Sequence, residues 1–179
     1  MDSLFPTPAA GFDHPLEILD GCHERILRNC ALIERIAAHI ARTGVDAEAR
    51  TAAAGVTRYF DTAGTNHHRD EEDDLFPALQ HYAPSSELNA VFDLLFRLKA
   101  DHKRLDALWT DMRLRLEAVA AGHEASLTAT VAADFKAAYE RHIALEEAEL
   151  LPLARRVLDE ALLRTLGGRM ARRRGVAFD

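Results

Sequence analysis

This chain of 179 residues contains few aromatic residues, only two cysteines and no long apolar run. No apolar stretch approaches the roughly 18 to 20 residues that a membrane-spanning helix needs, so we expect no membrane partner. The net charge of -7 lacks the basic excess that nucleic acid binding favours, so we expect no nucleic acid partner. The opening stretch MDSLFPTPAAGFDHP has no basic start followed by an apolar segment and therefore does not resemble a signal peptide. We expect a cytoplasmic protein.

The two cysteines, Cys22 and Cys30, lie eight residues apart in one helical pattern. This spacing puts them on one face of a helix, about 12 Å apart, whereas a disulfide needs Cα atoms roughly 4.4 to 6.8 Å apart. They cannot bridge each other within one straight helix. We therefore expect two free thiols that pack in the core, as in a reducing compartment.

Apolar residues recur with helical periodicity along most of the chain, which predicts an all-α protein. Pro15 suits the first turn of a helix, and Ser85 or Ser86 is the expected N-cap of the third helix. Pro77 is expected to kink its helix or to start a fresh turn, and Pro152 is expected to interrupt its helix. The predicted long helices cover about 15–43, 46–82, 85–122 and 126–158, and a short helix covers about 159–173.

Connections of a few residues make neighbouring helices antiparallel, so these elements predict an up-down-up-down four-helix bundle with a short C-terminal helix. We expect one domain over residues 1–179, with the bundle core at about 15–158, a short N-terminal segment and a C-terminal helix or tail. Three consecutive arginines, residues 172–174, form the one basic cluster, and we expect them to belong to a solvated tail.

An internal repeat singles out the second and fourth helices. The stretch HHRDEEDDLFP, which begins at His67, recurs as HIALEEAELLP, which begins at His142. The alignment matches Glu71 with Glu146, so each helix carries a histidine followed four residues later by a glutamate. Such a pair differs by roughly 40° around the helix and about 6 Å along it, so both side chains project together.

The first and third helices repeat as well. LEILDGCHERI, which contains His23, aligns with LFRLKADHKRL, which contains His102. The first two helices thus form a hairpin that recurs as the next two. All four histidines and both glutamates share a face with apolar neighbours, so we expect them to converge inside the bundle. An ionised carboxylate buried without a partner costs several kcal/mol, which a bound cation would offset.

Four imidazoles and two carboxylates are too many ligands for one tetrahedral zinc ion. They suit two ions with octahedral preference, each taking two histidines, with Glu71 and Glu146 bridging between them. An oxo or hydroxo bridge would add a fifth ligand to each ion and leave an open position for a small diatomic molecule. Imidazole and carboxylate donors without thiolate favour iron, with manganese or zinc as alternatives.

This alternation of single-histidine and H-x-x-x-E helices, and above all the stretch HHRDEEDDLFP, resembles the hemerythrin-like HHE cation-binding domains over about residues 15–153. The resemblance implies a four-helix bundle around a non-haem di-iron centre. The matching positions would supply the metal ligands, which are His23, His67, Glu71, His102, His142 and Glu146.

The same resemblance implies a protein that binds or senses O2, NO or H2O2, or stores iron. The sequence shows no separate substrate pocket, nucleophile or cofactor fingerprint, which favours a binding protein over an enzyme. Two alternatives remain. The first is a protein that donates iron to a partner protein in the repair of iron-sulfur clusters, because a set of four histidines and two glutamates resembles that branch of the family. The second is a di-iron redox enzyme that reduces peroxide or nitric oxide.

Two assignments stay open within the site. Oxygen-carrying hemerythrins have a fifth histidine one turn after the third-helix histidine, where this chain has Asp106. Asp106 is therefore either a further carboxylate ligand or a residue beside the ligands that leaves a position open for water. His68 and Glu72 have the same spacing as the pair one residue earlier, but Ile143 replaces His68 in the fourth helix, which favours His67 as the ligand. His68 is then expected to orient the ligands.

The remaining acidic residues near the ligands are expected to divide between two roles. Glu72 and Glu147 each follow a predicted ligand and are expected to orient the ligand histidines. Asp70, Asp73 and Asp74 are expected to face solvent, as charge runs in proteins usually do.

Overall fold

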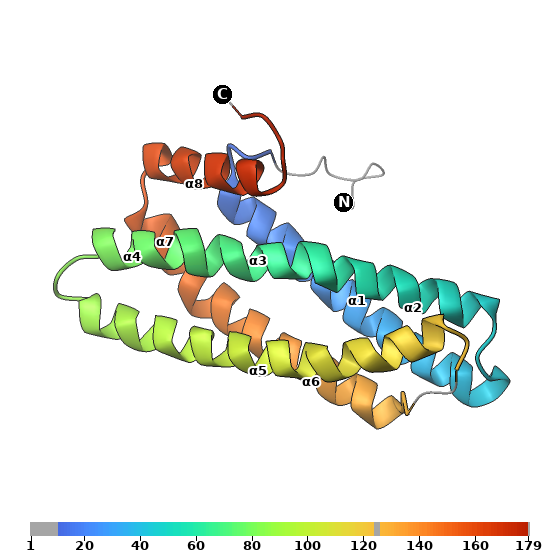
Figure 1. The fold of residues 1–179 in the computed structure, drawn as a ribbon. Coiled ribbons are helices and arrows are strands. Elements are labelled where there is room, and N and C mark those ends of the chain that lie inside the picture. Colours follow the sequence, from blue (N-terminus) through green and yellow to red (C-terminus); the bar gives the residue numbers. More distant parts are fainter. Residues whose placement is uncertain (1–10, 124–125, 179) are drawn as a thin grey trace, which may run out of the picture.

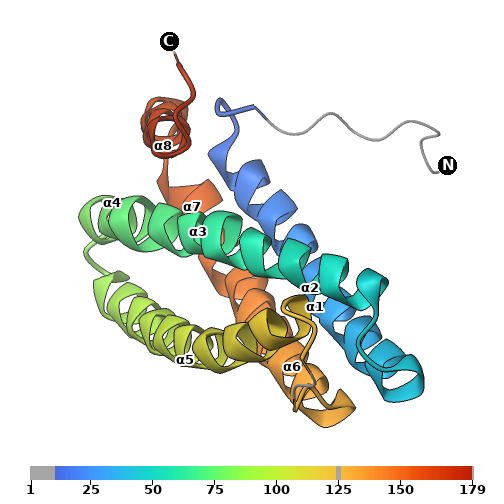
Figure 2. The same cartoon turned by 45° about the vertical axis from the view of Figure 1, so that its right-hand side comes forward.

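The computed structural model describes residues 11–123 and 126–178, and these residues form helices and no strand. Four long helices run antiparallel to their chain neighbours and form a bundle (Figure 1). A shorter helix near the C-terminus lies outside the bundle (Figure 2). The predicted all-α bundle with a short C-terminal helix is therefore confirmed. Residues 1–10 of the predicted N-terminal segment lie outside the described residues.

Two of the long helices are regular and two are built from several segments. The regular ones are α1 (Pro15–Thr43) and α5 (Leu88–Ala120). The second helix runs through α2 (Ala47–Tyr59), η1 (Phe60–Gly64), α3 (Thr65–Arg69), η2 (Asp70–Leu75) and α4 (Phe76–Tyr82). The fourth runs through α6 (Ala129–Leu145), η3 (Glu146–Leu150) and α7 (Leu151–Val157), and is followed by α8 (Glu160–Arg173). None of the helices in the described part of the chain is long and apolar enough to cross a membrane.

The third helix begins differently from the prediction. It starts at Leu88, and Glu87 rather than Ser85 or Ser86 occupies the cap position, without a side-chain hydrogen bond to the helix. The carboxylate of Glu87 instead accepts two hydrogen bonds from the guanidinium of Arg156, at 2.9 and 2.7 Å. This paired geometry connects the start of α5 to α7.

The second and fourth helices widen into π-helical turns, η2 and η3, directly before a proline. In each turn the amide of the residue before Pro77 or Pro152 donates to the carbonyl five residues earlier, which belongs to Glu71 or Glu146. The wider turn makes room for a proline ring, which clashes with a carbonyl of the preceding turn in a regular helix. Each proline lies in the first turn of the helix that follows, α4 or α7. Pro77 thus starts a fresh turn, which is one of the two predicted alternatives, and the fourth helix continues through Pro152, where an interruption was predicted.

The apolar core consists of two clusters with a polar layer between them. The change from one cluster to the other occurs at a predicted ligand in each long helix. In α1, for example, Leu19 belongs to one cluster and Ile26 to the other, and His23 lies between them. The polar layer is thus closed off from water on both sides along the bundle axis.

Cys22 and Cys30 are both buried and free, as the sequence predicted. Burial raises the pKa of both thiols, that of Cys30 to about 12. Both therefore remain in the unreactive thiol form at neutral pH, which agrees with a packing role.

Buried ion pairs attach α8 to the bundle. Asp70 and Asp74, which were expected to face solvent, are 0% and 4% exposed. Arg173 pairs with both of them, and Nη2 of Arg174 lies 2.6 Å from Oδ2 of Asp70. The expectation of a solvated basic tail is therefore wrong for these two arginines, while Arg172 is exposed. The two arginines neutralise the carboxylates, which would be costly to bury alone.

Candidate metal centre

Six buried side chains meet in the polar layer of the bundle, and each is at most 2% exposed. They come from all four long helices and are the six predicted ligands: His23 (α1), His67 (α3), Glu71 (η2), His102 (α5), His142 (α6) and Glu146 (η3). The neighbouring pair His68 and Glu72 is oriented differently, since Glu72 remains 38% exposed. Of the two possible registers, His67 and Glu71 are therefore the pair that faces the interior.

These six residues form two groups, and the potential ligand atoms within each group lie within 4.8 Å of one another. One group contains His23 and His67 with both glutamates, and the other contains His102 and His142 with both glutamates. Glu146 directs Oε2 to His23 Nε2, at 3.1 Å, and Oε1 to His142 Nε2, at 3.0 Å. Glu71 directs Oε1 to His67 Nε2, at 3.6 Å, and Oε2 to His102 Nε2, at 3.3 Å. Each carboxylate thus offers one oxygen to each group, as a ligand that bridges two ions does.

The polar atoms of this layer are unsatisfied by hydrogen bonds. Among the described residues, ten buried side-chain nitrogen and oxygen atoms lack a hydrogen-bond partner, and all ten belong to these six side chains. They include Nε2 of all four histidines and both oxygens of both glutamates. Each unsatisfied buried polar atom costs about 1 to 3 kcal/mol, and more when it is charged. The Nε2 atoms and the carboxylate oxygens lie close to one another but are not aligned for hydrogen bonds. This set of donor atoms therefore fits bound cations.

Comparison with known protein families agrees with this geometry. The hemerythrin HHE cation-binding domain matches residues 14–154, a range that contains all six side chains. The chain belongs to the hemerythrin HHE cation-binding family. It is also similar to an uncharacterized protein of Haemophilus influenzae, with 28% identity over 176 residues, which are 98% of this chain and 99% of that protein. The family resemblance inferred from the sequence is therefore confirmed.

Two further glutamates of the HHE domain contact predicted ligand histidines at the ring nitrogen that faces away from the centre. Oε1 of Glu147 lies 3.3 Å from Nδ1 of His23, and Oε1 of Glu72 lies 2.6 Å from Nδ1 of His102. A carboxylate in this position fixes the tautomer and orientation of the ring and leaves Nε2 for a metal ion. Both contacts cross between the hairpins. The sequence predicted that these glutamates orient ligands, but it did not identify their histidines.

The two central carboxylates of the HHE domain differ in proton affinity. Burial and the neighbouring Glu146 raise the pKa of Glu71 to about 8. Burial acts in the same direction at Glu146, but contacts with His102, His142 and His23 outweigh it and hold the pKa of Glu146 well below its ordinary value. Burial would lower the pKa of His102, but contacts with Glu146 and Glu71 outweigh it and raise that pKa to about 10. Without a cation, His102 and Glu71 therefore hold protons at neutral pH.

Asp106, whose role the sequence left open, lies at the edge of the HHE centre and is 71% exposed. Its Oδ1 atom is 3.5 Å from Nδ1 of His68, and it belongs to neither group of converging ligand atoms. Asp106 thus has the geometry of a residue that orients a histidine rather than that of a direct ligand. Burial lowers the pKa of His68 despite this contact, which favours the neutral ring.

Asp70 is the residue beside the centre whose place the sequence analysis missed. It directly precedes Glu71, is fully buried, and pairs with two arginines of the C-terminal region. A signal was present, since Asp70 and Asp74 are four residues apart and therefore share one face of their helix. This spacing indicates a common partner, but it does not identify the arginines that provide it.

Proposed function

We propose that this protein holds two non-haem iron ions in its polar layer and uses them to bind or sense O2, NO or peroxide, or to store iron. The observation that carries the proposal is the division of the oxygens of Glu71 and Glu146 between the two pairs of histidines. A carboxylate with one oxygen in each group suits a bridge between two ions. Four imidazoles and two carboxylates, without thiolate, support iron over a structural zinc ion.

The side chains around the ligands support this function by controlling protons and water. When bound, a pair of iron ions supplies reversible electron transfer and an open coordination position for a small molecule. Glu72 and Glu147 hold the Nδ1 protons of His102 and His23, which keeps Nε2 of both rings available for an ion. Phe76, which is fully buried, lies parallel to the His102 ring with 5.9 Å between ring centroids and excludes water from that side.

A cavity of about 250 Å³ between α5 and α6 supports the entry of a small molecule. Its lining includes Leu105, Leu108 and Ala138, two arginines, and His142 of the centre. A cavity beside one of the candidate ligands suits a protein that exchanges O2, NO or peroxide. The same cavity supports the alternative of a di-iron redox enzyme, since turnover of peroxide or nitric oxide also requires exchange with solvent.

The experiment that tests the proposal is to measure metal content and visible absorption on protein reduced without oxygen and then exposed to air. Two irons per chain, with an absorption change that reverses on deoxygenation, would support a binder or sensor. Irreversible oxidation together with consumption of peroxide or nitric oxide in the presence of a reductant would favour the redox enzyme. Ready transfer of iron to a chelator or to an apo iron-sulfur protein would favour the iron donor. One zinc ion per chain, or no metal, would contradict the proposal.

A further inference from the structure

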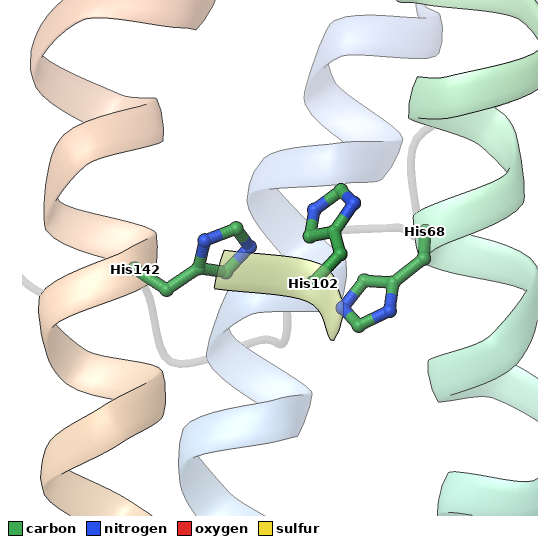
Figure 3. Close-up of side chains that lie close together, drawn as sticks. All are labelled: His68, His102 and His142. Atoms are coloured by element: carbon green, nitrogen blue, oxygen red, sulfur yellow. The ribbon is translucent and has the colours of Figure 1, made fainter. Parts of the chain in front are cut away.

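His68 is a histidine beside the centre that the six predicted ligands do not include. Its ring stacks on that of His102, with 4.1 Å between centroids and 15° between planes, and its centroid lies 6.0 Å from that of His142. One ring nitrogen from each of these three histidines lies within 4.8 Å of the other two. Figure 3 shows a nitrogen of the His68 ring pointing toward the other two side chains. Potential ligand nitrogens of the three histidines therefore lie close together.

We propose that the His68 ring turns out of its stack on His102 when metal binds and becomes an additional ligand of the ion held by His102 and His142, because two stacked rings cannot both direct their in-plane lone pairs at one ion. This inference rests on the proposed function and makes the two positions unequal. The ion near His102 would have three imidazoles, whereas the ion near His23 and His67 would have two.

The contacts of His68 repeat those of two predicted ligands. Its Nδ1 atom faces the carboxylate of Asp106 at 3.5 Å, as Nδ1 of His23 faces Glu147 and Nδ1 of His102 faces Glu72. A neutral ring with its Nδ1 proton directed at a carboxylate has the lone pair of Nε2 free for a metal ion. Asp106 therefore acts through His68, in a position where the sequence allowed it to be a ligand itself.

The competing explanation is that His68 only packs. The ring of His102 lies between the rings of Phe76 and His68, both nearly parallel to it, and an aromatic ring of any kind could provide that contact. Packing does not require a nitrogen, however, whereas coordination does. A variant that keeps the ring and removes the nitrogens therefore separates the two roles.

The test uses His68→Phe, His68→Ala and, as a matched control, His81→Ala, because His81 is an exposed histidine in the same hairpin. Each full-length protein is stripped with a chelator, checked for helicity, and titrated with Co2+ without oxygen while the absorption bands of cobalt are recorded. The wild type and His81→Ala should bind two ions. Both His68 variants should bind one ion as the wild type does and the other at least about tenfold more weakly.

Imidazole provides the second readout. Because His68 is 15% exposed, added imidazole can reach the space left in His68→Ala and should restore the affinity and the cobalt spectrum, whereas His68→Phe should not respond. Wild-type binding in His68→Phe would overturn the assignment, and so would a loss in His68→Ala that imidazole does not reverse. A wild type that binds no cobalt would overturn the proposed function as well, so the two failures are distinguishable.

Discussion

Glu146 approaches all four predicted ligand histidines, at distances of 3.0 to 4.0 Å. Its pKa lies well below the ordinary value, so it carries a negative charge at neutral pH in the centre of the polar layer. Glu71 has a raised pKa and holds a proton instead. The two bridging candidates are thus equivalent in the sequence repeat but not in charge, and Glu146 provides the main attraction for a cation.

This difference leads to a prediction about stoichiometry. Glu146→Ala removes one oxygen from each group, so we expect both ions to be lost, with close to zero iron per chain. His142→Ala removes a donor from one group only, and we expect about one iron per chain to remain. Elemental analysis of the purified variants measures this, with Glu149→Ala as the control, because Glu149 lies in the same turn but is exposed. Wild-type iron content in both ligand variants would show that the ligand assignment is wrong.

A second prediction concerns pH. His102, with a pKa of about 10, and Glu71, with a pKa of about 8, both hold protons at pH 7 when no cation is bound. A metal ion must displace these protons, so metal affinity should rise as the pH increases from about 6 to 8 and fall as the pH decreases. Calorimetric titrations in buffers of different ionisation enthalpy measure the number of protons released. An affinity and enthalpy independent of both pH and buffer would contradict the prediction.

At the scale of the helices, the π-helical turns η2 and η3 both position a predicted ligand and allow the helix to continue through a proline. Each turn contains a predicted bridging glutamate and ends before a proline. Each adds a residue to one turn, which changes the direction of the helix face that follows. Such turns are frequent at functional sites, because the extra residue moves one side chain without breaking the helix. The histidine and the glutamate of each pair thus lie on opposite sides of a junction between two helical forms.

The C-terminal helix α8 gives the third prediction. Arg173→Ala removes a partner from two buried carboxylates, and breaking such a pair costs about 3 to 5 kcal/mol when nothing replaces it. Because Arg174 still pairs with Asp70, and Arg169 with Asp74, we expect a smaller loss of about 2 kcal/mol in the free energy of unfolding.

The control for this prediction is Arg172→Ala, which changes an exposed arginine of the same helix and should alter stability by less than about 0.5 kcal/mol. Urea denaturation of the metal-free proteins measures both values. Equal stabilities of the two variants would show that α8 does not depend on these ion pairs.

The sequence predicted which six side chains meet inside the bundle, but it did not predict most of the contacts around them, for a physical reason. His23 alone would pass for a buried packing residue, but the repeat that aligns it with His102 indicated the helix face on which it lies and led to its prediction as a ligand. The repeat carries no information on contacts between hairpins, so the pairing of Glu72 with His102 could not be derived. Asp70 and Arg173 lie 103 residues apart, and a charge run indicates solvent exposure unless its distant partner is known.

At the scale of the whole molecule, the polar layer separates two apolar clusters and contributes to stability only when its charges are compensated. Removing the metal leaves buried donors unsatisfied, so we expect a chelator to lower the melting temperature and added Fe2+ to restore it. Ions at a thousandfold excess over their Kd would stabilise the fold by about 4 kcal/mol per site. Differential scanning calorimetry measures the shift. Glu146→Ala should melt at the same temperature with and without chelator, and a chelator effect on that variant would contradict the prediction.

The contacts of Glu72 and Glu147, which run between the two hairpins, also determine what would happen if the hairpins were separated. Each hairpin contributes three of the six predicted ligands, and each also provides a carboxylate that contacts a histidine of the other hairpin. The connection between the hairpins, from α4 to α5, spans only a few residues and carries no predicted ligand. A chain cut at this connection would yield two fragments, neither of which has a complete coordination shell. Reassociation of the fragments would then depend on metal, and iron supply would become a condition for assembly.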